Sequence, residues 1–274
     1  MSVSDWAGTE GEHWAANADG YTRRLAHYGD LLVDAAAFVP GERVLDVGCG
    51  CGDVSVAAGR AVGADGAVVG VDLSEAELAV AGARAAAAGL GHVSFVAADA
   101  TTFVPERAGF DVVVSRFGVM FFDDPVAAFA NLRSLLVPGG RLVFVCWQNL
   151  ILNDWIFVPA AAVAEVLPLP VPADPHAPGP FAFADADRVT SVLTDAGFAP
   201  PSVQPVAAKV WVGDTPDEAA GFLRSTGMGR AIFADADQAA IDEATRLAAA
   251  AVAPHLGEHG VELDGAAWLV TATA

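Results

Sequence analysis

Short runs of β-branched and apolar residues alternate with longer Ala- and Leu-rich segments between residues 43 and 147. The short runs predict strands and the longer segments predict helices. Strands separated by helices imply right-handed crossovers and a parallel sheet. Some runs are apolar throughout, as in Val112-Val113-Val114, which indicates a sheet covered on both faces. The predicted strands are Arg43–Val47, Ala67–Val71, Val93–Ala97, Phe110–Ser115 and Arg141–Trp147, and the predicted helices are Asp53–Val62, Ser74–Ala88 and Pro125–Leu136.

Ser74 is a candidate N-cap for the helix that follows the second predicted strand. Glu77 stands three residues further on, at the spacing of a capping box. In such a box the glutamate side chain accepts the N–H of the capping serine. The sequence therefore predicts that both side chains serve to start this helix.

The rest of the chain shows weaker patterns. Trp14, Tyr21 and Tyr28 recur every seven residues, so they share roughly one face of a helix near the N-terminus. Many prolines follow the last predicted strand, and a long loop of this kind often forms a lid. A further helix is expected over 184–198, with final strands over 203–212 and 265–273. The chain accordingly divides into a helical N-terminal cover (1–40), an α/β core (41–147), a Pro-rich lid or substrate insertion (148–185), and C-terminal helices and strands that complete the sheet (186–274), within which 214–256 form a second cap element.

The net charge of the chain limits the kinds of partner that it is expected to bind. It has 274 residues, of which 34 are acidic and 14 basic, for a net charge of −20. Such a chain repels phosphate backbones and anionic membrane surfaces, and no Lys/Arg cluster offsets the charge. Neither nucleic acid nor a membrane is therefore an expected partner, whereas a small-molecule substrate is.

The chain starts without a basic stretch and apolar core, and no uncharged apolar run reaches the length of a membrane span, so we expect a soluble, cytoplasmic protein. Cys49, Cys51 and Cys146 have no Cys/His pair at zinc-site spacing, so no metal is expected. Whether the chain forms a homo-oligomer is left open.

The loop Asp46-Val47-Gly48-Cys49-Gly50-Cys51-Gly52 follows the first predicted strand and opens a helix. Glycines let a backbone approach a ligand closely, and this context separates a binding loop from a chance match. The dinucleotide fingerprint G-x-G-x-x-G holds a pyrophosphate at a helix N-terminus. Here Asp53 replaces the third glycine, and its carboxylate, with that of Asp46, would repel a pyrophosphate. The loop favours a cationic ligand without phosphate, a description that fits S-adenosylmethionine (SAM).

Two further acids follow the next two strands. Asp72 could accept hydrogen bonds from both hydroxyls of a ribose, as the equivalent acid does in nicotinamide-cofactor sites. Asp99 could accept one from an adenine amino group. Each acid alone could be a capping or surface residue. With Asp46, however, they fall at the carboxyl ends of three successive strands, where open α/β sheets bind ligands.

These motifs resemble those of the class I (Rossmann-like) SAM-dependent methyltransferases, and most closely the bacterial small-molecule type. The resemblance covers roughly residues 40–147, and Cys51 departs from the Thr or Ser that the family often has. It implies a doubly wound α/β fold whose seven-stranded, mostly parallel sheet has the order 3-2-1-4-5-7-6 with the last strand antiparallel, and SAM as cofactor. The matching segments are Leu45–Gly52, Asp72, Asp99, Phe110–Ser115 and Leu136–Leu142.

The resemblance also implies a set of cofactor contacts. Leu73 and Ala100 could sandwich the adenine or serve as core, and Arg116 could meet a carboxylate or form a surface ion pair. Trp14 and Tyr21 could cover the sulfonium through a cation–π contact, or pack the N-terminal helix on the sheet. The candidate cofactor residues are Asp46, Gly48, Cys49, Gly50, Asp72, Leu73, Asp99, Ala100, Ser115, Arg116, Phe117, Trp14 and Tyr21.

Methyl transfer is an in-line displacement that requires alignment and exclusion of water. It requires a base only when the acceptor is protonated, and the candidates are His27, Asp154 and His176. An apolar acceptor pocket could use aromatic side chains that core packing would equally explain. These are Trp147, Trp155, Phe157, Phe181 and Phe183.

We therefore expect methyl transfer to the O, N or C atom of a small, largely apolar metabolite, as in secondary metabolism. Three alternatives remain: a SAM-binding protein of this fold that catalyses another reaction, such as a cyclisation, a non-catalytic SAM-binding protein, and a nicotinamide oxidoreductase.

Overall fold

The computed structural model describes residues 3–107, 109–170 and 174–274. The chain forms two compact units. Strands β6 (Ser202–Gly213) and β8 (Gly260–Thr273) contribute residues to both. The first unit comprises Met1–Trp147, Pro178–Val206 and Ala267–Ala274, and the second comprises Gln148–Ala177 and Ala207–Ala266.

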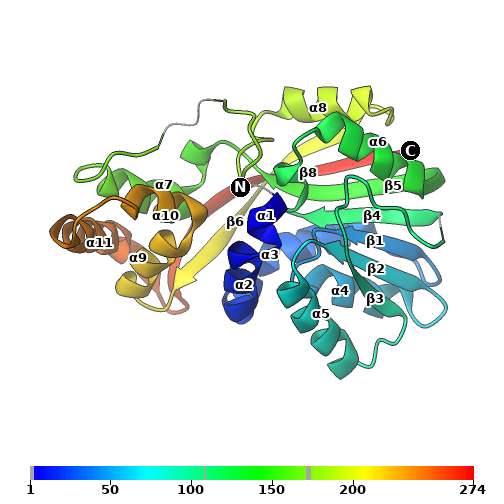
Figure 1. Cartoon of the computed structure of the whole chain (residues 1–274), viewed down its shortest axis with the longest axis horizontal. Helices are drawn as coiled ribbons and strands as arrows, with labels where there is room; N and C mark the ends of the chain where they lie inside the picture. The colour runs from blue at the N-terminus through cyan, green and yellow to red at the C-terminus, as the bar shows by residue number, and fades with distance from the viewer. Residues whose placement is uncertain (1–2, 108, 171–173) are drawn as a thin grey trace. The chain divides into compact units, whose positions relative to one another are not determined.

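The sheet has the strand order β3-β2-β1-β4-β5-β8-β6 (Figure 1). β1 lies between β2 and β4 and is parallel to both. β8 runs antiparallel to β5, with Arg141 opposite Thr273 and Trp147 opposite Ala267. Because the two-residue β7 (Leu256–Gly257) adds one to the numbering, this order is the expected 3-2-1-4-5-7-6 with an antiparallel last strand, which is confirmed. The first five strands are β1 (Arg43–Val47), β2 (Ala67–Asp72), β3 (Val93–Ala97), β4 (Phe110–Arg116) and β5 (Leu136–Trp147).

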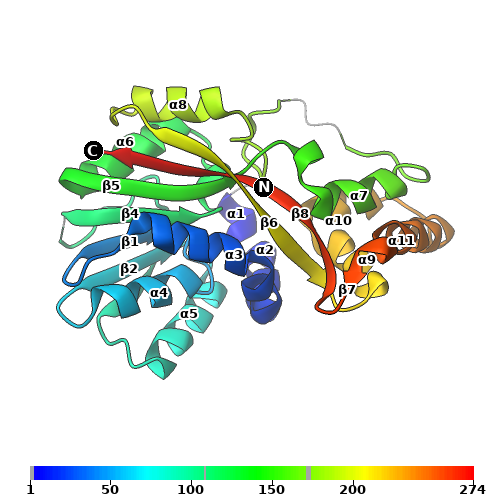
Figure 2. The same ribbon diagram turned by 180° about the vertical axis from the view of Figure 1, so that it is seen from behind.

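Helices cover both faces of this sheet. Figure 2 shows α3 and α4 on one face, and Figure 1 shows α6 on the other, where α8 packs beside it. The central valines Val112, Val113 and Val114 are fully buried, as expected of a strand between two helical layers. The helices of the first unit are α1 (Val3–Trp6), α2 (Thr9–Ala16), α3 (Ala18–Ala36), α4 (Asp53–Val62), α5 (Glu75–Ala87), α6 (Pro125–Leu135) and α8 (Ala186–Asp195), with a 3-10 turn η1 (Val119–Phe121).

The expected capping box of α5 forms only in part. Ser74 Oγ accepts the N–H of Glu77 at 3.2 Å, as an N-cap should. The N–H of Ser74, however, donates to Asp72 Oδ1 at 3.0 Å rather than to Glu77. The aspartate that ends β2 thus takes the place expected for the glutamate, and the Glu77 side chain is left for another contact.

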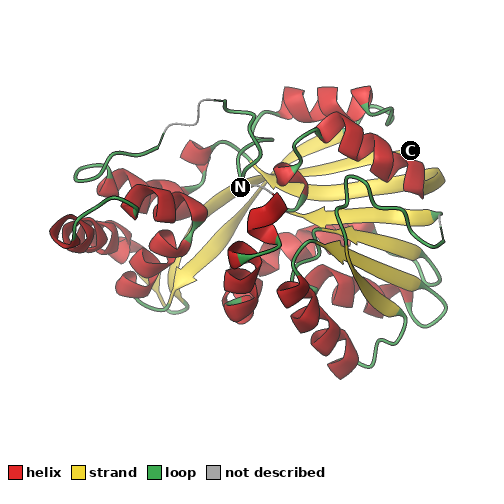
Figure 3. Cartoon of the chain, in the orientation of Figure 1, coloured by secondary structure: helices red, strands yellow, loops and turns green. Residues whose placement is uncertain are grey.

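The second unit is mainly helical (Figure 3). In it α11 packs against α7 and α9. The Pro-rich stretch includes the regular helix α7, which the sequence analysis did not expect, because a proline such as Pro159 usually interrupts a helix. Residues 171–173 of that stretch, and 1–2 of the N-terminal cover, lie outside the described residues. The elements are η2 (Leu150–Leu152), α7 (Asp154–Val163), α9 (Pro216–Ser225), α10 (Gly227–Phe233), α11 (Gln238–Val252) and η3 (Ala253–His255).

No helix within the described ranges combines the length and the apolar content that crossing a bilayer requires.

The loops that follow β1 and β4 touch each other through two glycines. Gly48 has a φ of +63°. A Cβ at Gly48 would lie 2.9 Å from the Cα of Gly118, and a Cβ at Gly118 would lie 2.8 Å from the carbonyl oxygen of Val47. Both distances are shorter than real Cβ contacts allow, so the carboxyl ends of these strands can come this close only without side chains.

We predict that Gly118→Ala lowers the free energy of unfolding by about 1–3 kcal/mol, because the added methyl group collides with backbone rather than with a flexible side chain. Gly82→Ala, on α5, is the matched control. Gly118 has helical dihedral angles, and a Cβ at Gly82 would meet nothing within 4 Å. The control should therefore gain about 0.5–1 kcal/mol from helix propensity alone. Urea denaturation of both variants measures the difference, and equal stabilities would contradict the proposed collision.

Candidate functional site

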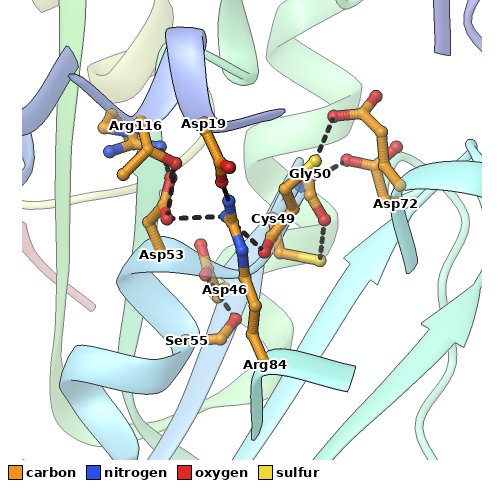
Figure 4. A network of polar contacts seen from close by, with 12 residues as sticks. Asp19, Asp46, Cys49, Gly50, Asp53, Ser55, Asp72, Arg84 and Arg116 are labelled. Carbon is orange, nitrogen blue, oxygen red and sulfur yellow. Dashed lines mark hydrogen bonds and ion pairs between the residues drawn. The ribbon is translucent and has the colours of Figure 1, made fainter. Parts of the chain in front are cut away.

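The Gly-rich loop after β1 is held by the carboxylate that ends β2. The N–H of Gly50 donates to Asp72 Oδ2 at 2.8 Å (Figure 4). The N–H of Ser74 donates to Asp72 Oδ1 at 3.0 Å. Burial raises the pKa of Asp72, while these backbone hydrogen bonds oppose the rise. Since a carboxylate has about four acceptor positions and the backbone of Leu73 also bonds Asp72, the carboxylate keeps some capacity for a ligand.

Asp46, at the other end of the loop, is buried. The residue is only 1% exposed. Its Oδ2 accepts a hydrogen bond from the hydroxyl of Ser55, on α4, at 2.6 Å. Burial raises the pKa of Asp46 to about 6, although the bond from Ser55 favours the ionised form. A buried carboxylate of this kind is stabilised by a positive charge nearby, whether from the protein or from a ligand.

The third acid follows β3 by two residues and shapes the turn there. Asp99 Oδ1 accepts both the N–H of Thr101, at 2.8 Å, and its hydroxyl, at 2.7 Å. The carbonyl of Ala100 accepts the amide of Asn131 at 3.2 Å. Because β1, β2 and β3 are adjacent and parallel, Asp46, Asp72 and Asp99 belong to the same edge of the sheet.

Asp53, the residue in place of a third glycine, is the centre of a group of charges from four elements. Its carboxylate accepts hydrogen bonds from Arg84 of α5 at 2.9 Å, from Arg116 of β4 at 2.7 Å and from the hydroxyl of Thr22 of α3 at 3.0 Å. Arg84 also reaches Asp19 of α3 at 2.9 Å. Figure 4 shows Asp53 between the two arginines. We call Asp19, Thr22, Asp53, Arg84 and Arg116 the Asp53 cluster.

The loop after β4 lies against the loop after β1. Ser115 Oγ donates to the carbonyl of Val47 at 2.7 Å. Phe117 is buried with a φ of +63°, a conformation that non-glycine residues rarely adopt. Its ring stacks on Trp147 with a centroid separation of 4.0 Å and meets Tyr28 edge-on. The aromatic contacts hold a strained backbone at the end of the strand.

The N-terminal aromatics also form a cluster. Trp14 and Tyr21 stack with ring centroids 3.7 Å apart and planes 5° from parallel. The indole N–H of Trp14 donates to Glu10 Oε1 at 3.2 Å. Both rings therefore pack on each other, and both are only partly buried.

Residues 44–140 match the family model that is described as a methyltransferase domain. The chain thus contains a methyltransferase domain over these residues. Aklanonic acid methyltransferase of Streptomyces sp. strain C5 is 38% identical over 116 residues, which are 42% of this chain and 53% of that protein. Nocamycin O-methyltransferase of Saccharothrix syringae is 39% identical over 111 residues, 40% of each chain.

The similarity to solved structures extends further along the chain. The YcgJ protein of Bacillus subtilis has a TM-score of 0.59 at 16% identity, over 90% of this chain and 98% of that one, which shows the shared fold. The chain spans about half or less of the length of the curated relatives it matches. SAM is the cofactor of this methyltransferase domain. The Gly-rich loop and the carboxyl of Asp72 beside it fit such a ligand, which is a cationic nucleoside without phosphate.

The three candidate bases are not brought together in one unit. His27 is exposed on α3 in the first unit. Asp154 begins α7 in the second unit, where His176 is exposed and its backbone N–H donates to Asp174 Oδ1 at 2.8 Å. None of the three has a described side-chain partner that would activate it, so each remains only a candidate.

The candidate pocket aromatics are likewise divided. Trp147 and Phe183 are buried in the first unit, where Phe181 is half-buried. In the second unit Trp155 donates its indole N–H to Asn153 Oδ1 at 3.1 Å, and Phe157 is exposed. Core packing therefore accounts for Trp147 and Phe183 without a substrate.

Sequence reasoning missed three residues of the site: Thr22, Arg84 and Glu77. The first two bind Asp53, which is 31 residues away from either of them in sequence, and no local pattern signals such a pair. Glu77 was assigned to the cap of α5. The signal that could have found it is its place in the first turn of the helix, five residues after Asp72. Within the described part of the chain, no three His, Cys, Asp or Glu residues gather as a metal site would require.

We predict that Asp53→Asn speeds amide hydrogen exchange in α3 about tenfold. The side chains of Asp53, Arg84 and Arg116 are 20%, 25% and 14% exposed, so the loss lies between that of surface and buried ion pairs, about 1–2 kcal/mol. The control is Asp264→Asn, which breaks an ion pair to Lys209 whose side chains are more than half exposed. Unchanged exchange in α3 would show that the Asp53 cluster does not hold this helix.

Proposed function

We propose that this chain transfers the methyl group of SAM to a small, largely apolar metabolite. The observation that carries the proposal is the contact of Asp72 with Gly50 and Ser74, which joins the Gly-rich loop to the acid after β2. Bound SAM supplies a methyl group on a positively charged sulfur. The residues of the chain bind and orient it, and the buried carboxyls favour its positive charge.

Each acid has a proposed partner on the cofactor. Asp72 accepts hydrogen bonds from the ribose hydroxyls. Asp99 accepts one from the adenine amino group through Oδ2, because both described bonds of Asp99 are made by Oδ1. Asp46 acts on the methionine amino group through its charge or through water, since its side chain is buried against Ser55. Leu73 and Ala100 flank the base.

The backbone and aromatic residues complete the proposed site. Gly48, Cys49 and Gly50 present backbone to the methionine and ribose portions, and Ser115 offers its carbonyl to the amino group. Arg116 is paired with Asp53, so we propose that it positions the loop rather than binding the cofactor carboxylate. Trp14, Tyr21 and Phe117 exclude water by covering the site with stacked rings.

The acceptor is proposed from the relatives. One of them is named as an O-methyltransferase and another for an organic acid, so an oxygen acceptor on a microbial natural product is the first to test. The net charge of −20 argues against nucleic acid as the substrate. A cytoplasmic location follows as part of the same proposal. His27, Asp154 and His176 stay candidates for a base if the acceptor is protonated.

Calorimetry tests the cofactor. We expect SAM and S-adenosylhomocysteine to bind and NAD not to bind. Asp72→Asn should weaken both by about 1.5–3 kcal/mol, because a carboxylate accepts charge-assisted hydrogen bonds that an amide cannot. Asp111→Asn is the control, since Asp111 also accepts a backbone N–H, that of Arg43, but lies at the opposite end of the strands. Binding of NAD without SAM would refute the proposal.

Label transfer tests the reaction. Methyl-labelled SAM is incubated with the protein and a bacterial metabolite extract, and the labelled product is identified by mass spectrometry. We expect label in a small apolar compound, and at least about tenfold less when the Asp72→Asn variant replaces the wild type at low SAM concentration. Tight binding of SAM without transfer to any pool would instead favour a non-methylating SAM protein.

A further inference from the structure

Glu77 is a buried carboxyl that the fold does not need. It lies in the first turn of α5 and is 2% exposed. Its role in the capping box is taken by Asp72, which accepts the N–H of Ser74. Its Oε1 is buried and has no hydrogen-bond partner. A buried polar atom without a partner is costly, so such an atom beside a binding loop calls for an explanation.

The other oxygen of Glu77 faces the Gly-rich loop. A Cβ at Gly50 would lie 2.9 Å from Glu77 Oε2, so the carboxyl lies directly against the Cα of this glycine. The thiol of Cys51 is 3.9 Å from the same oxygen. Gly50 is also the residue whose N–H bonds Asp72. Glu77, Gly50 and Asp72 therefore form one group at the loop.

The N-terminal cover closes on this group. Glu10, on α2, is a buried residue whose charge acts on Glu77. A side chain at Gly11 would collide with Ser74, so α2 lies directly on the start of α5. Glu77 is thus shielded from bulk water, so solvent does not satisfy its unpartnered oxygen.

We propose that Glu77 is a second ribose-binding carboxyl of the SAM site, beside Asp72. The inference rests on the proposed use of SAM and adds a residue to its site. It explains why a carboxyl with an unsatisfied oxygen stands against the glycine that Asp72 holds.

The two carboxyls offer different hydrogen bonds. An ionised Asp72 can only accept, whereas a sugar hydroxyl both donates and accepts. A protonated Glu77 supplies the donor that Asp72 lacks. Two ionised carboxylates in one buried group repel each other, so one of them keeps its proton.

The direction of the pKa of Glu77 agrees with this division. The charged or titratable groups that face it are Asp72 from β2, Cys51 from the loop and Glu10 from α2. Burial and the charges of Asp72 and Glu10 raise the pKa of Glu77 to about 8, against the bond from the Cys51 thiol. Glu77 is therefore protonated at neutral pH and ionises above it.

Three variants test the proposal by calorimetry with S-adenosylhomocysteine. Glu77→Leu, which cannot hydrogen-bond, should bind about tenfold more weakly at pH 7, which is about 1.4 kcal/mol. Glu77→Gln keeps a donor and an acceptor and should stay within about threefold of the wild type. Glu75→Gln, on the exposed side of the same turn, is the control and should bind as the wild type does.

Ligands without one hydroxyl locate the contact. Glu77→Leu should lose less affinity for 2′-deoxyadenosine or 3′-deoxyadenosine than for adenosine, because one deoxy ligand lacks the hydroxyl that Glu77 meets. Equal losses for all three nucleosides, or unchanged binding of S-adenosylhomocysteine by Glu77→Leu, would overturn the proposal. If the wild type binds none of these ligands, the proposed function fails instead.

The pH dependence of the unliganded protein is a second readout. Since the pKa of Glu77 is higher in the folded chain, its contribution to stability is present below pH 4.5 and is lost as the pH rises through about 8. Glu77→Gln should therefore lose less thermal stability than the wild type between pH 6 and 9. The affinity of the wild type for uncharged 5′-methylthioadenosine should fall over this range, and that of Glu77→Gln should not. Parallel profiles would contradict a proton on Glu77.

Discussion

One carboxylate joins two parts of the site that are far apart in sequence. Asp72 accepts the N–H of Gly50 with one oxygen and the N–H of Ser74 with the other, so it ties the loop after β1 to the start of α5. Without it the Gly-rich loop would lose one of its bonds to β2 and α5 would lose a bond at its N-terminus, where backbone N–H groups have no helical partner. The same carboxylate is the proposed ribose ligand. Structure and binding therefore depend on one side chain, and a control such as Asp111→Asn is needed to separate them.

The site concentrates negative charge in a buried region, and the protein balances only part of it. Asp53 is neutralised by Arg84 and Arg116, whereas Asp46 and Glu77 have no arginine partner in the described bonds and their pKa values are raised by burial. Burial of acids without a cation destabilises the chain above their pKa values. A ligand that brings a positive charge removes part of that cost. If SAM binds as proposed, it should therefore gain more from these carboxyls than its product S-adenosylhomocysteine, which lacks the sulfonium charge.

Local patterns predicted the sheet well, because the periodicity of strands and helices and the glycines of the loop depend only on residues that are close together in sequence. The acids near the strand ends could be placed for the same reason, since Asp46, Asp72 and Asp99 each lie within two residues of the end of a run that predicts a strand. Contacts between distant segments could not be predicted. Arg116 and Asp53 are 63 residues apart, and nothing near either residue signals the pair. The role of Glu77 was predicted wrongly for a different reason. Its spacing from Ser74 fits a capping box, but the N–H of Ser74 donates to Asp72 instead. Helix α7 was missed because Pro159 outweighs its apolar neighbours in a local analysis.

There is a physical reason why the cofactor site could be predicted from the sequence and the acceptor site could not. A cofactor that carries a sulfonium, an amino group and a ribose is bound by charges and hydrogen bonds, which require particular residue types at particular strand ends. An apolar acceptor is bound by shape, which Trp, Phe, Leu or Val can supply in many combinations. The candidate aromatics reflect this freedom, because Trp147 and Phe183 are buried in contacts that a core would need in any case. The acceptor of this methyltransferase domain must therefore be found through the labelled product, and its pocket then identified by which aromatic substitution changes KM for that compound alone.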